Sequence, residues 1–219
     1  MVEYEKDPIV YPYITEYLRK EIPEKQGILK ELEDYAKEND VPIVFPETAQ
    51  LLEVLCAVKR PKRILEVGCA IGYSAILMSQ YLDDGGTVTT LEWDAQTAEI
   101  ARENIKKAGL EDKINVICND AKEVIPTLTA KYDIIFLDGP KAHYIYMLND
   151  CIRLLNKGGL LISDNVLYKG MTADDDHVIR RKITIVKRLR RFISAQMQRQ
   201  ELKTVVLPLG DGVTVGVKL

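Results

Sequence analysis

Three carboxylates stand at or near the ends of short apolar runs in this sequence. Glu66 lies two places before Gly68, and Glu92 and Asp120 close the next two apolar runs. A glycine at position 68 allows a sharp backbone turn and lets a ligand approach where a Cβ would clash. An acid in the place of Glu92 can accept both ribose hydroxyls of a nucleotide, and Asp120 can accept from an adenine amino group. Together these residues predict a pocket for an adenosine-containing ligand.

The spacing of the glycines disfavours a nicotinamide cofactor. Gly68 and Gly72 are arranged as G-x-x-x-G, whereas the dinucleotide fingerprint is G-x-G-x-x-G with the pyrophosphate on a helix N-terminus. A glutamate two places before the first glycine suits a cationic ligand, either an ammonium or a sulfonium. A dehydrogenase is therefore the weakest of the functions considered.

A second group of polar side chains follows the fourth and fifth apolar runs. Asp138 ends the fourth run, and Asp164 and Asn165 end the fifth. The carboxyl ends of neighbouring parallel strands lie beside the ligand crevice of such a sheet. Two carboxylates and an amide are hard oxygen donors that suit Mg²⁺ better than zinc. Each residue alone can also be a helix N-cap or a turn acid, but the combination favours a metal site.

A basic segment follows in the last third of the chain. An apolar stripe at helical spacing accompanies it, formed by Val178, Ile179, Ile183, Val186, Leu189, Ile193 and Met197. Such a helix fits contact with a phosphate backbone, although a run of charge is also typical of a solvated helix face. The basic residues are Arg180, Arg181, Lys182, Lys187, Arg188, Arg190 and Arg191.

Alternating apolar runs and helical segments must position these residues. Short runs at 63–67, 87–91, 114–118, 134–137 and 160–163 alternate with helical segments at 73–81, 95–108, 121–128 and 144–155. This repeated pattern predicts a parallel sheet covered by helices on both faces. A helix over about 175–198 follows, and strands at 204–207 and 213–218 flank a Pro-Leu-Gly-Asp-Gly turn that predicts an antiparallel pair.

The first 60 residues have helical periodicity, and two prolines break it within 41–46. We interpret 1–219 as one domain, in which a helical cap over 1–60 precedes an α/β core over 61–219. The break at 41–46 is typical of a segment that can line a ligand pocket. Simple packing is the alternative interpretation of this region.

Composition indicates a globular protein without a membrane span. Hydrophobic residues make up 47% of the chain and charged residues 29%, and its apolar runs are far shorter than the ~20 residues that a spanning helix needs. Met1–Asp7 lacks the order of a signal peptide, so a cytoplasmic location is expected. The net charge of −3 means that nucleic-acid affinity requires a local basic patch. We expect four reduced thiols in the core rather than a zinc or redox site, at Cys56, Cys69, Cys118 and Cys151.

These motifs, in this order over about 41–219, resemble the catechol and caffeoyl-coenzyme A O-methyltransferases. The resemblance implies a Rossmann-like class I methyltransferase fold with a mostly parallel seven-stranded sheet, an antiparallel C-terminal strand and N-terminal helices. It implies S-adenosylmethionine as cofactor and Mg²⁺ or Mn²⁺ as metal, held by Asp138, Asp164 and Asn165. It also assigns the role of base to Lys141, three places after the first acid. The cofactor-binding residues that it implies are Val44, Glu66, Gly68, Ser74, Glu92, Asp120, Ala121 and Asp138.

The last third of the chain also resembles the bacterial tRNA 5-hydroxyuridine methyltransferases. The shared features are Asp164 to Gly170, the basic helix and the turn over Pro208 to Gly212, together with the segment beginning at Val41. This resemblance implies methylation of wobble 5-hydroxyuridine, whose hydroxyl beside the O4 carbonyl is an oxygen pair like that of a catechol. It implies tRNA as a partner and a homodimer as the assembly. A small-molecule catechol or caffeoyl-CoA-type acceptor is the alternative, and a non-catalytic RNA-binding module is a third hypothesis.

Overall fold

The computed structural model describes residues 9–219, so Met1–Asp7 lies outside the described residues. Its α-helices are α1 (Pro12–Glu21), α2 (Ile28–Glu38), α3 (Pro46–Lys59), α4 (Tyr73–Ser79), α5 (Ala95–Lys107), α6 (Ala121–Val124), α7 (Tyr144–Leu154) and α8 (Ile183–Gln198). Short 3-10 helices occur at η1 (Ile125–Thr127), η2 (Lys141–His143) and η3 (Arg180–Lys182). The strands are β1 (Arg63–Val67), β2 (Thr87–Glu92), β3 (Ile114–Cys118), β4 (Tyr132–Leu137), β5 (Leu155–Ser163), β6 (Leu202–Leu207) and β7 (Val213–Lys218).

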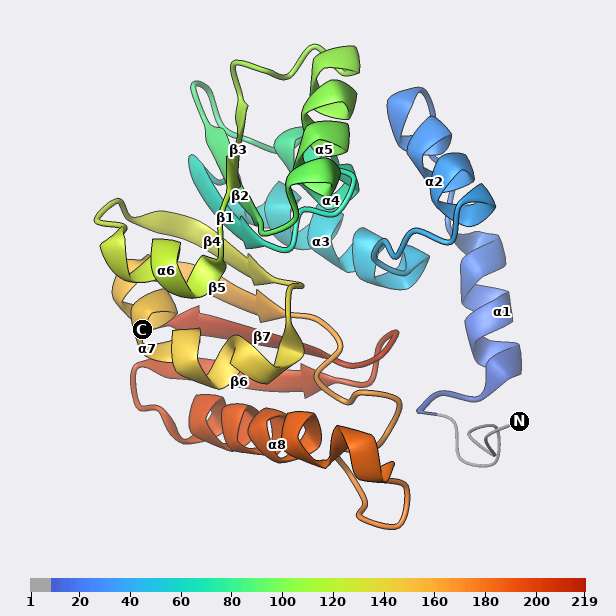
Figure 1. The fold of residues 1–219 in the computed structure, drawn as a ribbon, viewed down its shortest axis with the longest axis vertical. Coiled ribbons are helices and arrows are strands. Elements are labelled where there is room, and N and C mark those ends of the chain that lie inside the picture. The colour runs from blue at the N-terminus through green and yellow to red at the C-terminus, as the bar shows by residue number, and fades with distance from the viewer. Residues whose placement is uncertain (1–8) are drawn as a thin grey trace.

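The seven strands form one sheet in the order β3-β2-β1-β4-β5-β7-β6 (Figure 1). Strands β1 to β5 pair in parallel, and β7 is antiparallel to both of its neighbours. The strand order reverses beside β1, where the chain crosses from β3 back to β4. Ligands of such sheets bind outside the carboxyl ends of the strands at this reversal. The predicted fold class is therefore confirmed, including the antiparallel strand near the C-terminus.

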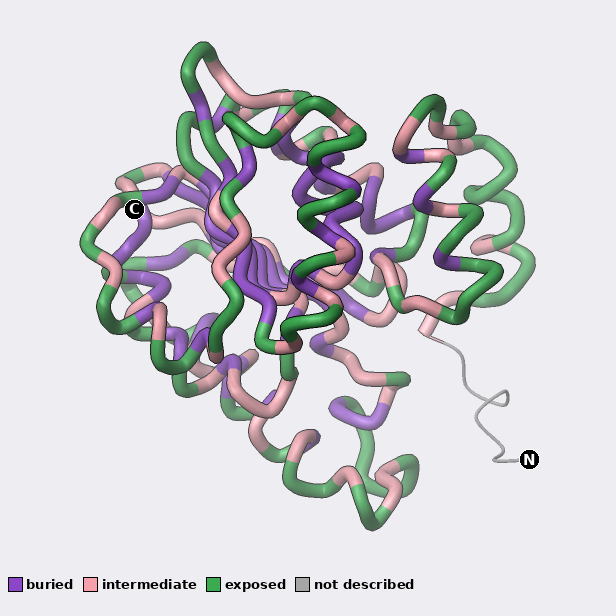
Figure 2. Tube along the Cα trace, turned by 45° about the horizontal axis from the view of Figure 1, so that its top comes forward, coloured by how far each residue is buried: buried purple, intermediate pink, exposed green. Residues whose placement is uncertain are grey.

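Two hydrophobic clusters pack on opposite faces of the sheet because successive strand residues point to opposite sides. In β1, Ile64 belongs to the cluster beneath α2 to α5, whereas Leu65 belongs to the cluster beneath α6 to α8. Figure 2 shows the buried segments gathered along the central strands, with exposed residues on the outer sides of the helices. This two-sided burial fixes the strand ends that carry the candidate functional residues.

The N-terminal helices are joined to the core near the carboxyl edge of the sheet. Helix α1 buries none of its own residues, but its Arg19 makes a two-pronged ion pair with Glu47 at 2.9 Å for each contact. The Arg19 guanidinium also lies over the ring of Phe45, 5.2 Å from its centroid. The predicted break at 41–46 is an extended segment, and Pro46 begins α3, where its missing N–H costs no helix hydrogen bond.

Several boundaries and exposures differ from those predicted. Helix α8 begins at Ile183, after η3, rather than near residue 175. Its buried face carries Phe192 and Gln196, while Ile183 and Met197, assigned to the apolar stripe, are exposed. Among the four free cysteines, Cys118 is exposed rather than in the core, because it ends β3, the edge strand of the sheet. Within residues 9–219, no helix is long and apolar enough to cross a membrane.

Candidate active site

Two adjoining cavities lie outside the carboxyl ends of β1 to β5. The first has a volume of about 480 Å³ and the second about 430 Å³. Gly68, Glu92, Trp93 and Pro140 line both cavities. The first cavity extends toward the ends of β2 and β3 and the start of α7, and the second toward the 42–45 segment and the ends of β4 and β5. A ligand in the first cavity would therefore lie against a ligand in the second.

Gly68 makes the close approach between β1 and β4 possible. Its φ is +97°, and a Cβ there would lie 2.6 Å from the carbonyl oxygen of Asp138 and 2.8 Å from the amide nitrogen of Gly139. The Asp138 N–H donates to the Val67 carbonyl at 2.8 Å, which holds the two strand ends together. The predicted need for glycine at this turn therefore arises from the protein's own backbone as well as from ligand access.

Glu92 fixes the glycine loop to the end of β2. Its Oε1 accepts from the backbone N–H groups of Trp93 and Asp94 at 3.0 and 3.1 Å, and its Oε2 accepts from that of Ala70 at 3.1 Å. Hydrogen bonds to an ionised carboxylate are stronger than those between neutral groups. Glu92 therefore shapes the loop and also lines both cavities, where Oε2 keeps a lone pair for a ligand hydroxyl.

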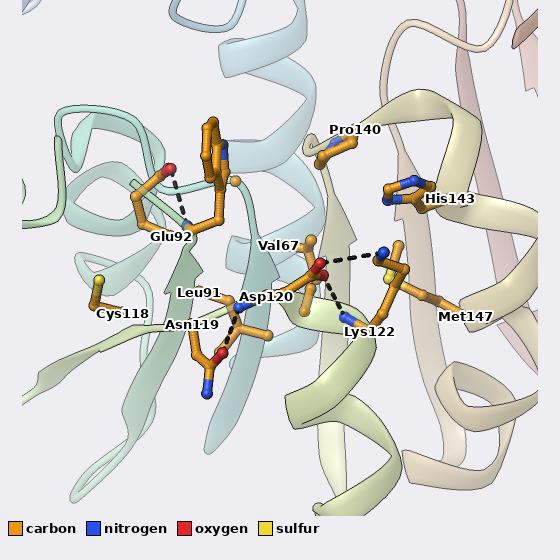
Figure 3. A pocket seen from close by; sticks show the side chains of 13 residues that line it. Val67, Leu91, Glu92, Cys118, Asn119, Asp120, Lys122, Pro140, His143 and Met147 are labelled. Carbon is orange, nitrogen blue, oxygen red and sulfur yellow. Dashed lines mark hydrogen bonds and ion pairs between the residues drawn. The ribbon is translucent and has the colours of Figure 1, made fainter. Parts of the chain in front are cut away.

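Asp120, at the start of α6, lines the first cavity apart from Glu92 (Figure 3). Ala121 lines the same cavity. Asp120 caps α6 by accepting from the Lys122 N–H at 2.9 Å, and it pairs with the Lys122 ammonium at 3.2 Å. The Lys122 N–H, followed by the weaker effect of its ammonium, lowers the pKa of Asp120. Asp120 is therefore the N-cap of α6, and it also lines the cavity where an adenine could lie.

Glu66 and Ser74, both predicted to bind the cofactor, line neither cavity. Glu66 is fully buried below the glycine loop, where its Oε2 accepts from the hydroxyl of Thr90 and its carboxyl group interacts with Ser74. Its Oε1 has no hydrogen-bond partner in the structure. Burial raises the pKa of Glu66 to about 7. Glu66 therefore packs beneath the glycine loop. Its unpaired Oε1 could accept a hydrogen bond from a polar group of a ligand.

The second cavity brings together Asp138, Asp164, Asn165 and Lys141. Asp164 is 1% exposed, and burial, followed by the charge of Asp138, raises its pKa to about 7. Burial also raises the pKa of Asp138, while Lys141 lowers it. Lys141 Nζ lies 2.8 Å from Oδ1 of Asp138. The two acids stand close together with one ammonium beside them.

This donor set fits a hard divalent cation. The charge of Asp138 raises the cost of ionising Asp164, and a dication bound by both carboxylates would relieve it. The oxygen donors of Asp138, Asp164 and Asn165 are of the kind that Mg²⁺ prefers. Among residues 9–219, no group of three or more His, Cys, Asp or Glu side chains could hold a metal ion, so a site here depends on the amide of Asn165.

Sequence reasoning missed the place of Trp93, which is 71% exposed and borders both cavities. Pro42 and Phe45 border the second cavity, as the 41–46 segment was predicted to do. Val44, predicted as a cofactor-binding residue, is buried in the same wall. The available signal was the position of Trp93, which is the only tryptophan of the chain and directly follows Glu92.

The seven basic residues assigned to RNA contact are not equivalent in the structure. Arg190 bonds to backbone carbonyls and to Asp175. Arg188 lies 5.2 Å over the ring of Tyr146, and Lys182 lies 5.8 Å over that of Tyr168. The remaining four are exposed side chains, namely Arg180, Arg181, Lys187 and Arg191.

Comparison with known proteins places the chain in a family. A family model described as O-methyltransferase matches residues 20–219. A catechol O-methyltransferase of Niastella koreensis is 33% identical over 137 residues, which cover 61% of this chain and 62% of that enzyme, less than two thirds of its length. A caffeoyl-CoA O-methyltransferase of Stellaria longipes is 28% identical over 88% of this chain and 83% of that enzyme. The chain belongs to the O-methyltransferase family.

Solved structures of the same kind share its fold. An O-methyltransferase from Bacillus cereus, in complex with SAH, superposes with a TM-score of 0.83 at 26% identity, over 94% of this chain and 97% of that one. The O-methyltransferase TomG from Streptomyces achromogenes, in complex with SAM, also gives 0.83, at 25% identity over 100% and 99% of the two chains. The architecture is thus that of the class I methyltransferases.

Proposed function

We propose that this chain transfers a methyl group from S-adenosylmethionine to an oxygen of an acceptor that presents two adjacent oxygens, with the help of a divalent metal ion. The observation that carries the proposal is the contact between the two cavities. One is lined by Glu92 and Asp120, the other by Asp138 and Asp164, and they share Gly68. Family membership supports the same reaction.

The first cavity has the donors and acceptors that an adenosine needs. Glu92 would accept the ribose hydroxyls, and Asp120 with Ala121 would face the adenine. Trp93 and Met147 offer apolar surface to the same ligand. The relatives from Bacillus cereus and Streptomyces achromogenes, solved with SAH and SAM, make this cofactor the natural candidate. When bound, it supplies an electrophilic methyl group on a sulfonium.

The second cavity would hold the metal and the acceptor. Asp138, Asp164 and Asn165 would bind a Mg²⁺ or Mn²⁺ ion. When bound, such an ion supplies positive charge that makes an acceptor hydroxyl more acidic. Lys141 Nζ, in the same cavity, would first release its own proton to solvent and would then, as the neutral amine, take the hydroxyl proton. The walls formed by Pro42 to Phe45 and by Trp93 would orient a planar acceptor, and alignment of the two reactants would supply much of the rate.

A small catechol or caffeoyl-CoA-type acceptor is the version that the relatives favour, since the two curated relatives described above carry those names. The test is transfer of label from S-adenosylmethionine to a panel of catechols and a caffeoyl thioester, with Mg²⁺ and with EDTA. Asp164→Ala should abolish transfer, whereas Asp112→Ala, an exposed acid before β3, should not. Full activity in EDTA, or in the Asp164 variant, would contradict the role of the metal.

A second candidate acceptor is a tRNA wobble 5-hydroxyuridine, and the basic face of α8 is the observation that favours it. No acidic residue occurs from Arg180 to Gln198. Helix α8 also packs against η2, which carries Lys141. Transfer to tRNA bearing that nucleoside should fall steeply as salt rises, because phosphate contacts release counterions. Transfer to a free catechol should be nearly independent of salt. A tRNA that is bound but never methylated would indicate the non-catalytic alternative.

A further inference from the structure

The loop that follows Asp164 has an unusual backbone. Asn165, Tyr168, Lys169 and Gly170 all have positive φ values, of 56°, 49°, 57° and 77°. Non-glycine residues in this region are strained and persist only where surrounding contacts over-determine them. We call residues 165–175 the acceptor loop, because Asn165 lines the second cavity. The conformation of this loop therefore needs an explanation in contacts from outside it.

The turn before β7 holds one side of the acceptor loop. The N–H groups of Val166 and Leu167 donate to the carbonyls of Gly212 and Asp211 at 2.9 and 3.0 Å. The Lys169 N–H donates to the Asp211 carboxylate. A Cβ on Gly212 would lie 2.3 Å from the Leu167 side chain, so the two segments are in tight contact. These bonds hold the first half of the loop. The second half, 171–175, is tied to the first by the N–H and the hydroxyl of Thr172, which donate to the Leu167 carbonyl at 3.3 and 3.1 Å, and it is held by another element.

Arg190 of α8 holds that other half. Its Nε donates to the Thr172 carbonyl at 2.8 Å, and one terminal nitrogen donates to the Met171 carbonyl at 3.1 Å. The other terminal nitrogen pairs with the Asp175 carboxylate. The planar guanidinium thus binds three acceptors of one loop at once, which a lysine ammonium on its flexible stem does less well.

We propose that Arg190 is a positioning residue for the acceptor site, which sets the conformation of the acceptor loop and through it the place of Asn165. This inference rests on the proposed function, because the proposed function assigns metal and acceptor binding to the second cavity. It also separates Arg190 from the basic residues around it, because its donors are turned toward the protein's own carbonyls. The first cavity is lined from β1 to β3, the start of α6, η2 and α7, and the hydrogen bonds of Arg190 to the acceptor loop reach none of these residues.

Arg153 of α7 provides a matched control. It also pairs with an acid, Asp150, and donates to the carbonyls of Ile125, Pro126 and Leu128 in another loop. Replacing either arginine by alanine therefore removes a similar set of bonds, but only Arg190 reaches the acceptor loop. A merely structural role would give the two variants the same phenotype.

The experiment compares the wild type, Arg190→Ala, Arg190→Lys and Arg153→Ala in three measurements. Trypsin cleavage after the exposed Lys169 reports loop order, Mn²⁺ titration by electron paramagnetic resonance reports the metal site, and SAH titration reports the first cavity. We expect Arg190→Ala to speed cleavage and to weaken Mn²⁺ binding by about 10- to 100-fold, as is typical for residues that orient metal ligands. SAH affinity should stay within about twofold of the wild type, and Arg190→Lys should recover only part of the loss.

Equal cleavage rates and equal Mn²⁺ affinities in Arg190→Ala and Arg153→Ala would overturn the inference. A parallel loss of SAH affinity would overturn it as well, because the effect would then be a general loss of structure. Failure of the proposed function looks different, since the wild type itself would bind no Mn²⁺ and would need no metal. In that case faster cleavage of Arg190→Ala alone would still support the control of the loop by Arg190, and unchanged cleavage would refute it.

Discussion

The ammonium of Lys141 lies 2.8 Å from Oδ1 of Asp138 and 3.1 Å from the carbonyl oxygen of the same residue. Lys141 begins the 3-10 turn η2 three residues after the strand-end acid, and its side chain folds back over that acid. The candidate base is thus paired with a candidate metal ligand. Occupation of Asp138 by a cation would free the lysine to face an acceptor in the second cavity.

Replacement of Lys141 by methionine should reduce turnover without removing cofactor binding. A positioned general base contributes about 10²- to 10⁴-fold to a rate, and Lys141 lines the second cavity but not the first. We expect kcat to fall in that range while SAH affinity is retained, as measured by steady-state kinetics and calorimetry. Lys157→Met, at an exposed position in β5, should match the wild type. A Lys141 variant with undiminished kcat would exclude it as the base.

Gly68→Ala should destabilise the protein and prevent cofactor binding. The new Cβ would overlap the backbone of Asp138 and Gly139 and would also impose strain at a φ of +97°. Left-handed strain alone costs about 1–3 kcal/mol. Gly109→Ala measures the cost of this backbone strain without steric overlap, because Gly109 has a φ of +67° with open space around it. Urea unfolding should show a larger loss for Gly68→Ala, and equal losses would argue against the close contact of β1 with β4.

Glu66→Gln should change how the stability of the cofactor-free protein depends on pH. Burial raises the pKa of Glu66 from an ordinary value near 4.5 to about 7. The protonated carboxyl therefore contributes fully to the free energy of unfolding at low pH, and this contribution is lost as the pH rises through 7. One such proton changes the free energy of unfolding by at most about 1.4 kcal/mol per pH unit. Asp164, with a pKa of about 7, acts in the same direction.

Melting temperatures of the wild type should therefore fall between about pH 5 and pH 8 more than those of Glu66→Gln. The exposed Glu123→Gln serves as the control and should follow the wild type. If the glutamine variant and the wild type showed the same decline with pH, the raised pKa attributed to burial of Glu66 would be wrong.

Trp93 should report ligand binding by its fluorescence. It is the only tryptophan in the chain, it is 71% exposed, and it borders both cavities. Burial of the indole by SAH should shift its emission to shorter wavelength, and an acceptor should change it further. A titration of the wild type that leaves emission unchanged, while calorimetry detects binding, would mean that the ligand lies away from Trp93. Trp93→Phe controls for the contribution of the tyrosines.

The repeated strand pattern made most of the architecture predictable. Strands such as Ile114–Cys118 and Val213–Lys218 were found at the predicted bounds, because a β-branched run between turn residues has few other ways to bury itself. The gathering of Asp138, Asp164 and Asn165 followed from their places at neighbouring strand ends. Their assigned roles in binding and catalysis remain predictions.

The side-chain orientations that the sequence did not predict arise from tertiary contacts. The guanidinium of Arg190 is surrounded by basic neighbours along the chain, and only the path of a loop 15 to 19 residues earlier turns it inward. Cys118 ends an apolar run, yet it is exposed because β3 is the edge strand of the sheet and Cys118 lines the first cavity. Glu66 and Ser74 belong to the expected motif, but they face the packing beneath the loop rather than a cavity.

The bonds between the acceptor loop and the turn before β7 have a consequence for synthesis of the chain. Lys169 and Asp211 are 42 residues apart in sequence, so the loop cannot take its final shape until the turn has left the ribosome. The residues of the first cavity come from β1 to β3, the start of α6, the segment from Pro140 to the end of η2 and α7, and all of them are made earlier. A nascent chain could therefore gain affinity for an adenosine ligand before it has a finished acceptor site, and that ligand could stabilise the growing chain.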